Sequence, residues 1–172
     1  MSHADRIQVL LDKQDCADLV FTLARAIDRC DAALIAACYH DDATDDHGMI
    51  KGTIAQFIAG VIPMLQAMRR TQHNVTNTLI RVSGDAARGE CYFIAQHTLV
   101  QDGDETEMFA AGRYLDRFER RGGAWKIAHR QAVYDWTMTV PASGGWDGPP
   151  LAALLQRGQR GPGDPSYPHF DN

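Results

Sequence analysis

Two residues that lie far apart in the sequence, Asp28 and His73, have side chains that could together remove a proton from a carbon atom. Asp28 ends the first helical pattern, and His73 begins the first long strand pattern. A carboxylate beside an imidazole orients the ring and favours its protonated form, and the pKa of histidine is ordinarily about 6.5. Because a helix C-terminus disfavours negative charge, the carboxylate at position 28 needs a reason other than closing the helix. The pair therefore suggests a general base that works near neutral pH without a cofactor.

The segments that must position this pair begin with a helical first third of the chain. Apolar residues recur at helical spacing over 15–29 and over 31–39, which predicts two amphipathic helices joined by a short turn. After the acidic stretch 41–46, Thr53 can cap a third helix that reaches Met68 and that Pro63 should kink. In the acidic stretch, His40 and His47 are interpreted as surface or loop groups. A metal site there, formed by adjacent residues without a second set of ligands, is poorly supported.

From His73 onward the apolar pattern shifts to a period of two. It predicts strands over about 73–82, 87–100, 107–119 and 124–138, separated by short turns that contain glycine. Such turns are too short for helical crossovers, so the sheet should be a mostly antiparallel meander. Three helices followed by four strands indicate an α+β fold with the helices packed on a curved sheet. Residues 141–172, rich in Gly and Pro, are expected to form a tail that packs on the domain, residues 1–140, or on a neighbouring subunit.

Composition and charge exclude several classes of function. A chain of 172 residues with 45% apolar and 23% charged residues is typical of one globular domain. The net charge of −5 argues against nucleic acid as a partner. No apolar run approaches the length that spans a bilayer, and the N-terminus lacks the pattern of a signal peptide, so we expect a cytoplasmic protein without membrane contact. Four cysteines without a CxxC pair are expected to be free, buried thiols.

Two segments of the chain resemble the SnoaL-like, NTF2-like proteins. The first contains AIDRCD at 26–31, AL at 33–34 and YHDDA at 39–43, and it resembles the DxxD…L…F…DA opening of that group. The second contains AGRYLDRFER at 111–120 and GAWKIAHR at 123–130, and it resembles the last hairpin. The resemblance covers about residues 5–140 and implies a cone-shaped α+β barrel.

Within this superfamily the chain is most similar to the cofactor-independent lyases, a group that includes hexachlorocyclohexane dehydrochlorinase, scytalone dehydratase and bile-acid 7α-dehydratase. The resemblance implies that Asp28 and His73 are catalytic and that Arg130 is a pocket arginine. Arg130 could instead pair with acidic residues on the outer side of the sheet. Leu23 replaces a lysine and Asp45 stands near the place of a pocket tryptophan in the dehydrochlorinase, so halide loss itself is not implied. The expected substrate-binding residues are Arg130, Tyr39, Asp45, Tyr114 and His97.

The resemblance implies a lyase that needs no cofactor and no metal and that acts on a hydrophobic cyclic or aromatic small molecule. His73 would take a proton while water, or formaldehyde from a hydroxymethyl group, departs, and Arg130, a tyrosine or a water would stabilise the anion. An isomerase or polyketide cyclase on the same fold and a non-catalytic binding module are the alternatives. Apolar residues on the second face of the sheet predict a homo-oligomer, and the resemblance favours a trimer.

Overall fold

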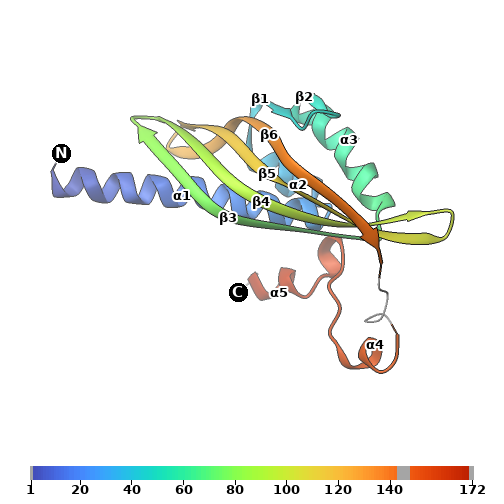
Figure 1. Ribbon diagram of the computed structural model, residues 1–172. Helices are drawn as coiled ribbons and strands as arrows, with labels where there is room; N and C mark the ends of the chain where they lie inside the picture. Colours follow the sequence, from blue (N-terminus) through green and yellow to red (C-terminus); the bar gives the residue numbers. More distant parts are fainter. Residues whose placement is uncertain (1, 143–147, 171–172) are drawn as a thin grey trace.

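The computed structural model describes residues 2–142 and 148–170, in which helices pack against one long, twisted sheet (Figure 1). The elements of the domain are α1 (His3–Asp28), α2 (Ala32–Ala37), β1 (Tyr39–Asp46), β2 (Lys51–Thr53), α3 (Ile54–Ala67), β3 (Arg70–Ser83), β4 (Ala86–Gln101), β5 (Asp104–Arg121) and β6 (Ala124–Pro141). Those of the tail are α4 (Leu151–Leu154), η2 (Gly161–Gly163) and α5 (Ser166–Phe170). Residues 143–147, 171 and 172 of the expected tail lie outside the described part.

The sheet has six strands in the order β2-β1-β6-β5-β4-β3. Strands β3 to β6 form an antiparallel meander, whereas β1 runs parallel to β6 and antiparallel to β2. The predicted α+β fold and mostly antiparallel sheet are therefore confirmed. The sheet is curved but not closed, because β2 and β3 remain as its two edges.

The sequence-based prediction was wrong for β1 and β2, because it assigned Tyr39 to the end of a helix and expected no strand in the acidic stretch 41–46 or at 51–53. Tyr39 opens β1 instead of ending a helix, because α2 stops at Ala37. Along β1 the burial alternates, with Ala43 and Asp45 buried and Thr44 exposed between them. Aspartate is depleted in strands, so four of them among eight residues concealed this alternation. The position of β1 is fixed instead by its pairing with β6.

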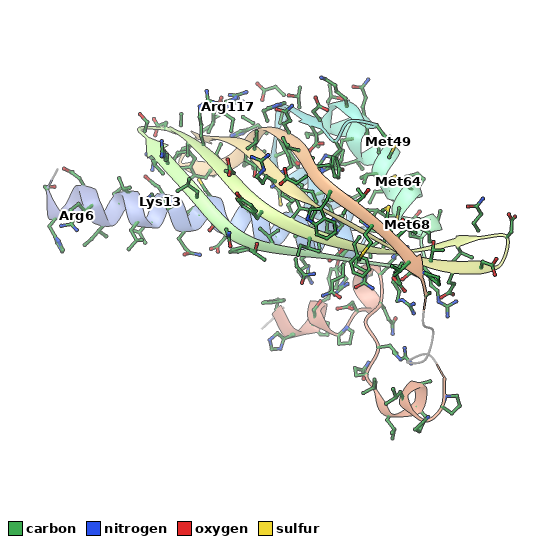
Figure 2. All side chains as sticks on the ribbon, in the orientation of Figure 1. Arg6, Lys13, Met49, Met64, Met68 and Arg117 are labelled. Atoms are coloured by element: carbon green, nitrogen blue, oxygen red, sulfur yellow. The ribbon has the colours of Figure 1, made fainter. Side chains whose placement is uncertain are left out.

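Two helices also differ from the prediction. Helix α1 begins at His3, where a capping box between Ser2 and Asp5 supplies the partners of the first backbone N–H groups. This first part carries Arg6 and extends beyond the sheet, so its apolar residues do not share the core-facing pattern (Figures 1 and 2). Helix α3 runs from Ile54 to Ala67, one residue short of the predicted end at Met68, and it includes Pro63.

The core lies between the three helices and one face of the sheet. Its fully buried side chains include Val20, Leu23, Ile35, Tyr39, Phe57, Leu65, Phe118 and Ile127. Met64 and Met68, at the end of α3, pack against this core (Figure 2). All four cysteines are free, and three of them are buried. Within the described residues, no helix combines the length and the apolar character needed to cross a membrane.

The opposite face of the sheet carries a row of exposed apolar side chains, which we call the outer patch. The register places its members on β3, β4 and β6, on the side away from the core. Each has between 42% and 58% of its surface exposed. The patch consists of Leu79, Tyr92, Ile94, Trp136 and Met138.

Candidate active site

The structure brings Asp28 and His73 into direct contact. The Nδ1 atom of His73 lies 2.7 Å from Oδ1 of Asp28, and the backbone N–H of His73 donates to Oδ2 at 2.8 Å. Both side chains are almost covered, with 9% of His73 and 12% of Asp28 exposed. The carboxylate thus holds both the ring and the backbone of the same residue, which fixes the direction of the imidazole.

The topology explains why one carboxylate can make both contacts. Asp28 is the last residue of α1, and His73 lies on β3, which is an edge strand of the sheet. On an edge strand, every second backbone N–H points away from the neighbouring strand and needs another acceptor. Asp28 is that acceptor for His73, and the two bonds offset the unfavourable charge at the helix C-terminus.

Burial raises the pKa of Asp28, but the hydrogen bonds from His73 and its charge outweigh burial, so the pKa is lowered below its usual range. Asp28 is therefore an anion throughout the neutral pH range. A carboxylate in this state stabilises an imidazolium that forms beside it. Among the described residues, the other ring nitrogen of His73, Nε2, has no hydrogen-bond partner. The ring can thus accept a proton at Nε2 while Nδ1–H donates to Asp28.

A second histidine, His97, stands at a right angle to His73, with ring centroids 5.3 Å apart. It is 8% exposed, and its buried Nδ1 has no partner in the described part of the chain. Burial, followed by the nearby charge of His73, lowers the pKa of His97 to about 4. His97 is therefore neutral near pH 7, and it can offer a hydrogen bond without carrying a charge.

Arg130 is the largest fully buried side chain, and it is paired with Asp116 by two hydrogen bonds of 2.7 Å. Its guanidinium lies 4.0 Å from the centre of the Tyr114 ring. Burial lowers the pKa of Arg130, but the charge of Asp116 raises it by more. The pKa therefore lies well above its usual range, and the group stays protonated. Asp116 and Arg130 face each other across β5 and β6 on the core side of the sheet. The alternative that Arg130 pairs with acidic residues on the outer side is therefore wrong.

Tyr39 and Asp45 also lie inside the fold, where they contact His47, which was interpreted as a surface or loop group. The hydroxyl of Tyr39 donates to Oδ2 of Asp45 at 2.8 Å, and Nδ1 of His47 contacts Oδ1 of the same carboxylate. Asp45 has no exposed surface, and the His47 side chain is 17% exposed. Burial, countered by Arg130 and reinforced by Asp45, raises the pKa of Tyr39, so its hydroxyl remains a donor.

His40, interpreted as a surface or loop group, is instead part of β1, whereas His47 does lie in the loop after β1, with its ring stacked on Phe57. His40 is buried and its Nε2 bonds the carbonyl oxygen of Glu119. Had the acidic stretch been recognised as a strand, its alternation would have placed Tyr39, Ala43 and Asp45 on one face, but His40 is buried out of that phase and His47 follows the end of β1. Asp116 was also missed, although it stands in the same hairpin as Arg130. Within the described residues, no three His, Cys, Asp or Glu side chains are arranged to hold a metal ion.

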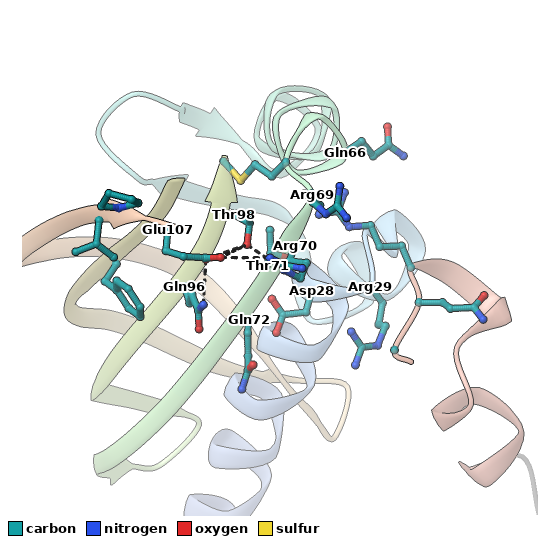
Figure 3. Close-up of a pocket in the computed structure, with 17 residues that line it drawn as sticks. Asp28, Arg29, Gln66, Arg69, Arg70, Thr71, Gln72, Gln96, Thr98 and Glu107 are labelled. Carbon is teal, nitrogen blue, oxygen red and sulfur yellow. Dashed lines mark hydrogen bonds and ion pairs between the residues drawn. The ribbon is translucent and has the colours of Figure 1, made fainter. Parts of the chain in front are cut away.

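A cavity of about 1070 Å³ opens where the end of α1, the end of α3, β3 and the tail meet (Figure 3). Asp28 and Thr71 line it on the side of the His73 contact. Thr98 and Glu107, joined by hydrogen bonds of 2.9 and 3.1 Å, line it on the other face of the sheet (Figure 3). Because β3 is the edge of the sheet, the cavity extends around it and reaches the pair through Asp28. His73 is not among its lining residues.

The tail forms one wall of this cavity with residues 158–160. It is held at the end of α1, where Tyr167 donates to Asp31 at 2.6 Å and stacks under Arg25, 4.4 Å from the ring centre. The backbone N–H of Gly161 also donates to the carbonyl oxygen of Arg29 at 2.8 Å. The tail therefore packs on its own domain next to the candidate site.

Solved structures share this arrangement of helices and sheet. LinA is 25% identical, with a TM-score of 0.67 over 84% of this chain and 96% of that one. A hexachlorocyclohexane dehydrochlorinase, LinA-type3 of Novosphingobium barchaimii, is 23% identical, with a TM-score of 0.67 over 83% and 96% of the two chains. A Novosphingobium aromaticivorans protein named Putative Scytalone Dehydratase is 18% identical, with a TM-score of 0.68 over 77% and 90%.

The amino-acid sequence matches a known family over most of the domain. No curated protein matches the chain. The model of the SnoaL-like domain, however, matches residues 8–131, a range that includes most of α1, the sheet up to the first part of β6, and both Asp28 and His73. The chain belongs to the SnoaL-like domain family.

Proposed function

We propose that this protein is a cofactor-independent lyase that removes water from a hydrophobic cyclic or aromatic molecule. The observation that carries the proposal is the contact of 2.7 Å between the His73 ring and the Asp28 carboxylate. General-base catalysis needs an imidazole whose orientation and charge are both controlled, and Asp28 supplies both. Similar structures are named as a dehydrochlorinase and a dehydratase, and both names describe an elimination.

In the proposed reaction, Nε2 of His73 takes a proton from a carbon atom next to a carbonyl group. The electron pair of that C–H bond forms a double bond as the C–O bond at the neighbouring carbon breaks. Asp28 stabilises the resulting imidazolium. Neutral His97, close to the His73 ring, can donate a hydrogen bond to the carbonyl oxygen as negative charge develops there.

The side chains next to the pair support a hydrophobic substrate. Val75 packs against the cluster that contains Phe93 and Tyr114, on the same side of the sheet as His73. The Phe93 and Tyr114 rings stack with centroids 4.3 Å apart, and Tyr134 meets Phe93 edge to face at 5.9 Å. An aromatic wall with a few polar groups is typical of sites for small apolar ligands.

The test is turnover without added metal or cofactor, on a panel of cyclic β-hydroxy ketones and hydroxymethyl aromatics. We expect the wild-type protein to release water from the cyclic alcohols, detected as the absorbance of the conjugated product. Loss of formaldehyde from the aromatics would show that the same base acts on a different leaving group. Rearrangement without loss of mass would identify an isomerase or cyclase instead. Binding of these compounds without formation of any product would indicate a non-catalytic binding module instead.

We also propose that the outer patch is buried between copies of this chain, with a trimer as the favoured assembly. Five large apolar side chains on one sheet face form an exposed surface of the kind that marks protein contacts. Light scattering should give about three times the chain mass of 19.0 kDa at micromolar concentration. Trp136→Glu places a charge in the patch and should shift the mass toward that of one chain. A wild-type monomer would contradict the assembly.

A further inference from the structure

The cavity beside Asp28 has an excess of positive charge in its lining (Figure 3). Arginines outnumber carboxylates among the residues that line it. The arginines are Arg29, Arg69, Arg70 and Arg160, and the carboxylates are Asp28 and Glu107. A concave site lined by one sign of charge attracts ligands of the opposite sign, so this cavity favours an anion.

Three of the four arginines already have a carboxylate partner. The partners are Asp164 for Arg29, at 3.3 Å, Glu105 for Arg69, at 2.9 Å, and Glu107 for Arg70, at 3.3 Å. The other carboxylate of the lining, Asp28, is held by His73. Neither carboxylate of the lining is therefore available to neutralise Arg160.

Arg160 has no acceptor in the described part of the chain. Its Nη2 atom is buried and makes no hydrogen bond, and no described carboxylate forms an ion pair with it. A guanidinium nitrogen that is shielded from water and unpaired raises the free energy of the folded protein, and a charged group does so more than a neutral one. A ligand that brings an acceptor to this guanidinium removes that cost.

The tail fixes the backbone on both sides of Arg160. The N–H of Gly161 donates to the carbonyl oxygen of Arg29 at 2.8 Å, and the N–H of Gln159 donates to Oδ2 of Asp164 at 2.8 Å. Asp164 is 3% exposed, so the acceptor for Gln159 is itself held inside the fold. The Arg160 side chain therefore starts from a defined position next to the end of α1.

The charge of Arg160 acts close to the candidate catalytic pair. Burial raises the pKa of the Cys30 thiol, the charge of Arg160 lowers it, and the charge of Asp28 raises it. Both charged groups therefore lie near Cys30, and both line the same cavity. A ligand anion at Arg160 is thus held next to the part of the cavity that Asp28 borders.

We propose that Arg160 binds a carboxylate of the substrate, so that the substrate is a hydrophobic ring compound with one acid group. This inference rests on the proposed function, because it takes this cavity as the place where the substrate of His73 binds. A guanidinium matches a carboxylate through two parallel N–H···O bonds, and one unpaired arginine matches one carboxylate. Apolar residues of the same lining can contact the ring, namely Met68, Phe109, Val140 and Pro141.

The test compares 2-naphthoate and 2-naphthamide, two probes of the same shape of which only the first is charged at pH 7.5. Isothermal titration calorimetry gives the affinity of each. We expect the wild-type protein to bind 2-naphthoate at least about tenfold more tightly, because a hydrogen bond to a charged group is stronger than a neutral one. In Arg160→Met the affinity for 2-naphthoate should fall by about that factor, and the affinity for 2-naphthamide should change by no more than about twofold.

Two further variants separate a direct contact from an effect of total charge. Arg6→Met removes the same charge from the part of α1 that extends beyond the sheet, so it should change neither affinity by more than about twofold (Figure 2). Arg160→Lys keeps the charge but not the planar pair of donors, and its affinity for 2-naphthoate should be intermediate. Because the readout is the ratio of two affinities within one protein, a partial loss of structure does not imitate it. Equal affinities in the wild-type protein, or a preference that persists in Arg160→Met, overturns the carboxylate site.

The site and the proposed function would fail in different ways. His73→Gln should bind both probes as the wild-type protein does, because His73 does not line the cavity. For any compound that the wild-type protein converts, 2-naphthoate should be a competitive inhibitor, and 2-naphthamide should be a much weaker one. Binding that depends on Arg160 without inhibition would show that the substrate does not use this site. Absence of any product with the wild-type protein would overturn the proposed function, although the preference for 2-naphthoate would remain.

Discussion

Replacing His73 with Gln should lower turnover by about 10²–10⁴-fold while the protein remains folded. Gln can still donate to Asp28 from its amide, so the contact at the end of α1 is partly kept, but it cannot accept a proton near neutral pH. The loss should appear in kcat, because the proton is transferred only in the transition state. Matched melting curves for wild type and variant would show that the effect is chemical. Wild-type activity in the folded variant would contradict the role of His73 as the base.

Asp28→Asn should also cause a large loss, and the double variant should be little worse than His73→Gln alone. The amide keeps an oxygen that can accept from the backbone N–H of His73, but it lacks the charge that stabilises the imidazolium. Two residues that act on one proton transfer are expected to be strongly non-additive. Activities that fall independently, so that the two factors multiply, would show that Asp28 does not act through His73.

Arg130→Met should destabilise the protein by about 3–5 kcal/mol, because it leaves the Asp116 carboxylate buried without its partner. Arg130 is 1% exposed and Asp116 is 3% exposed, so water cannot replace the two lost hydrogen bonds. A domain typically has only about 5–15 kcal/mol of net stability, so the change is a large part of the total. Urea unfolding at one fixed protein concentration gives the free energies, since assembly would make them concentration-dependent.

The double variant Arg130→Met with Asp116→Leu should recover much of that loss, because no uncompensated charge remains. Arg121→Met is the matched control. Arg121 pairs with Asp42 at 2.7 Å on the surface, where their side chains are 44% and 68% exposed. Its loss should cost less than about 1 kcal/mol. Equal costs for Arg130→Met and Arg121→Met would mean that the buried pair does not stabilise the fold.

The amino-acid sequence by itself determined the meander. Its hairpins are closed by short turns that contain glycine, and such turns can be located before any strand partner is known. In the structure, Gly84 and Gly122 in these turns each have a φ of 61°, which glycine adopts readily. The period of two also places neighbouring residues such as His129 and Arg130 on opposite faces of one strand. These are local properties of the backbone and of neighbouring residues, and they do not require a distant contact.

The contact between Asp28 and His73 was expected only through the resemblance, because the pair joins residues 45 positions apart. Nothing local to Asp28 identifies its acceptor role. That role arises because β3 forms the edge of the sheet and presents the free N–H of His73 to the end of α1.

Only the tertiary structure decided what the residues from Tyr39 to His47 do. Their acidic composition is typical of a loop, and β1 exists because β6, more than 80 residues later in the chain, offers it a parallel partner. That pairing buries Asp45, aligns it with Tyr39 and turns His47 inward against Phe57. The tertiary structure also decided that Arg130 meets Asp116, because alternation places a side chain on one face of the sheet but does not identify the residue opposite it. Several strands have similar alternating patterns, so the pattern alone does not determine which strands pair. Long-range pairing makes that choice, and the free energy for it comes from packing the whole sheet against its helices.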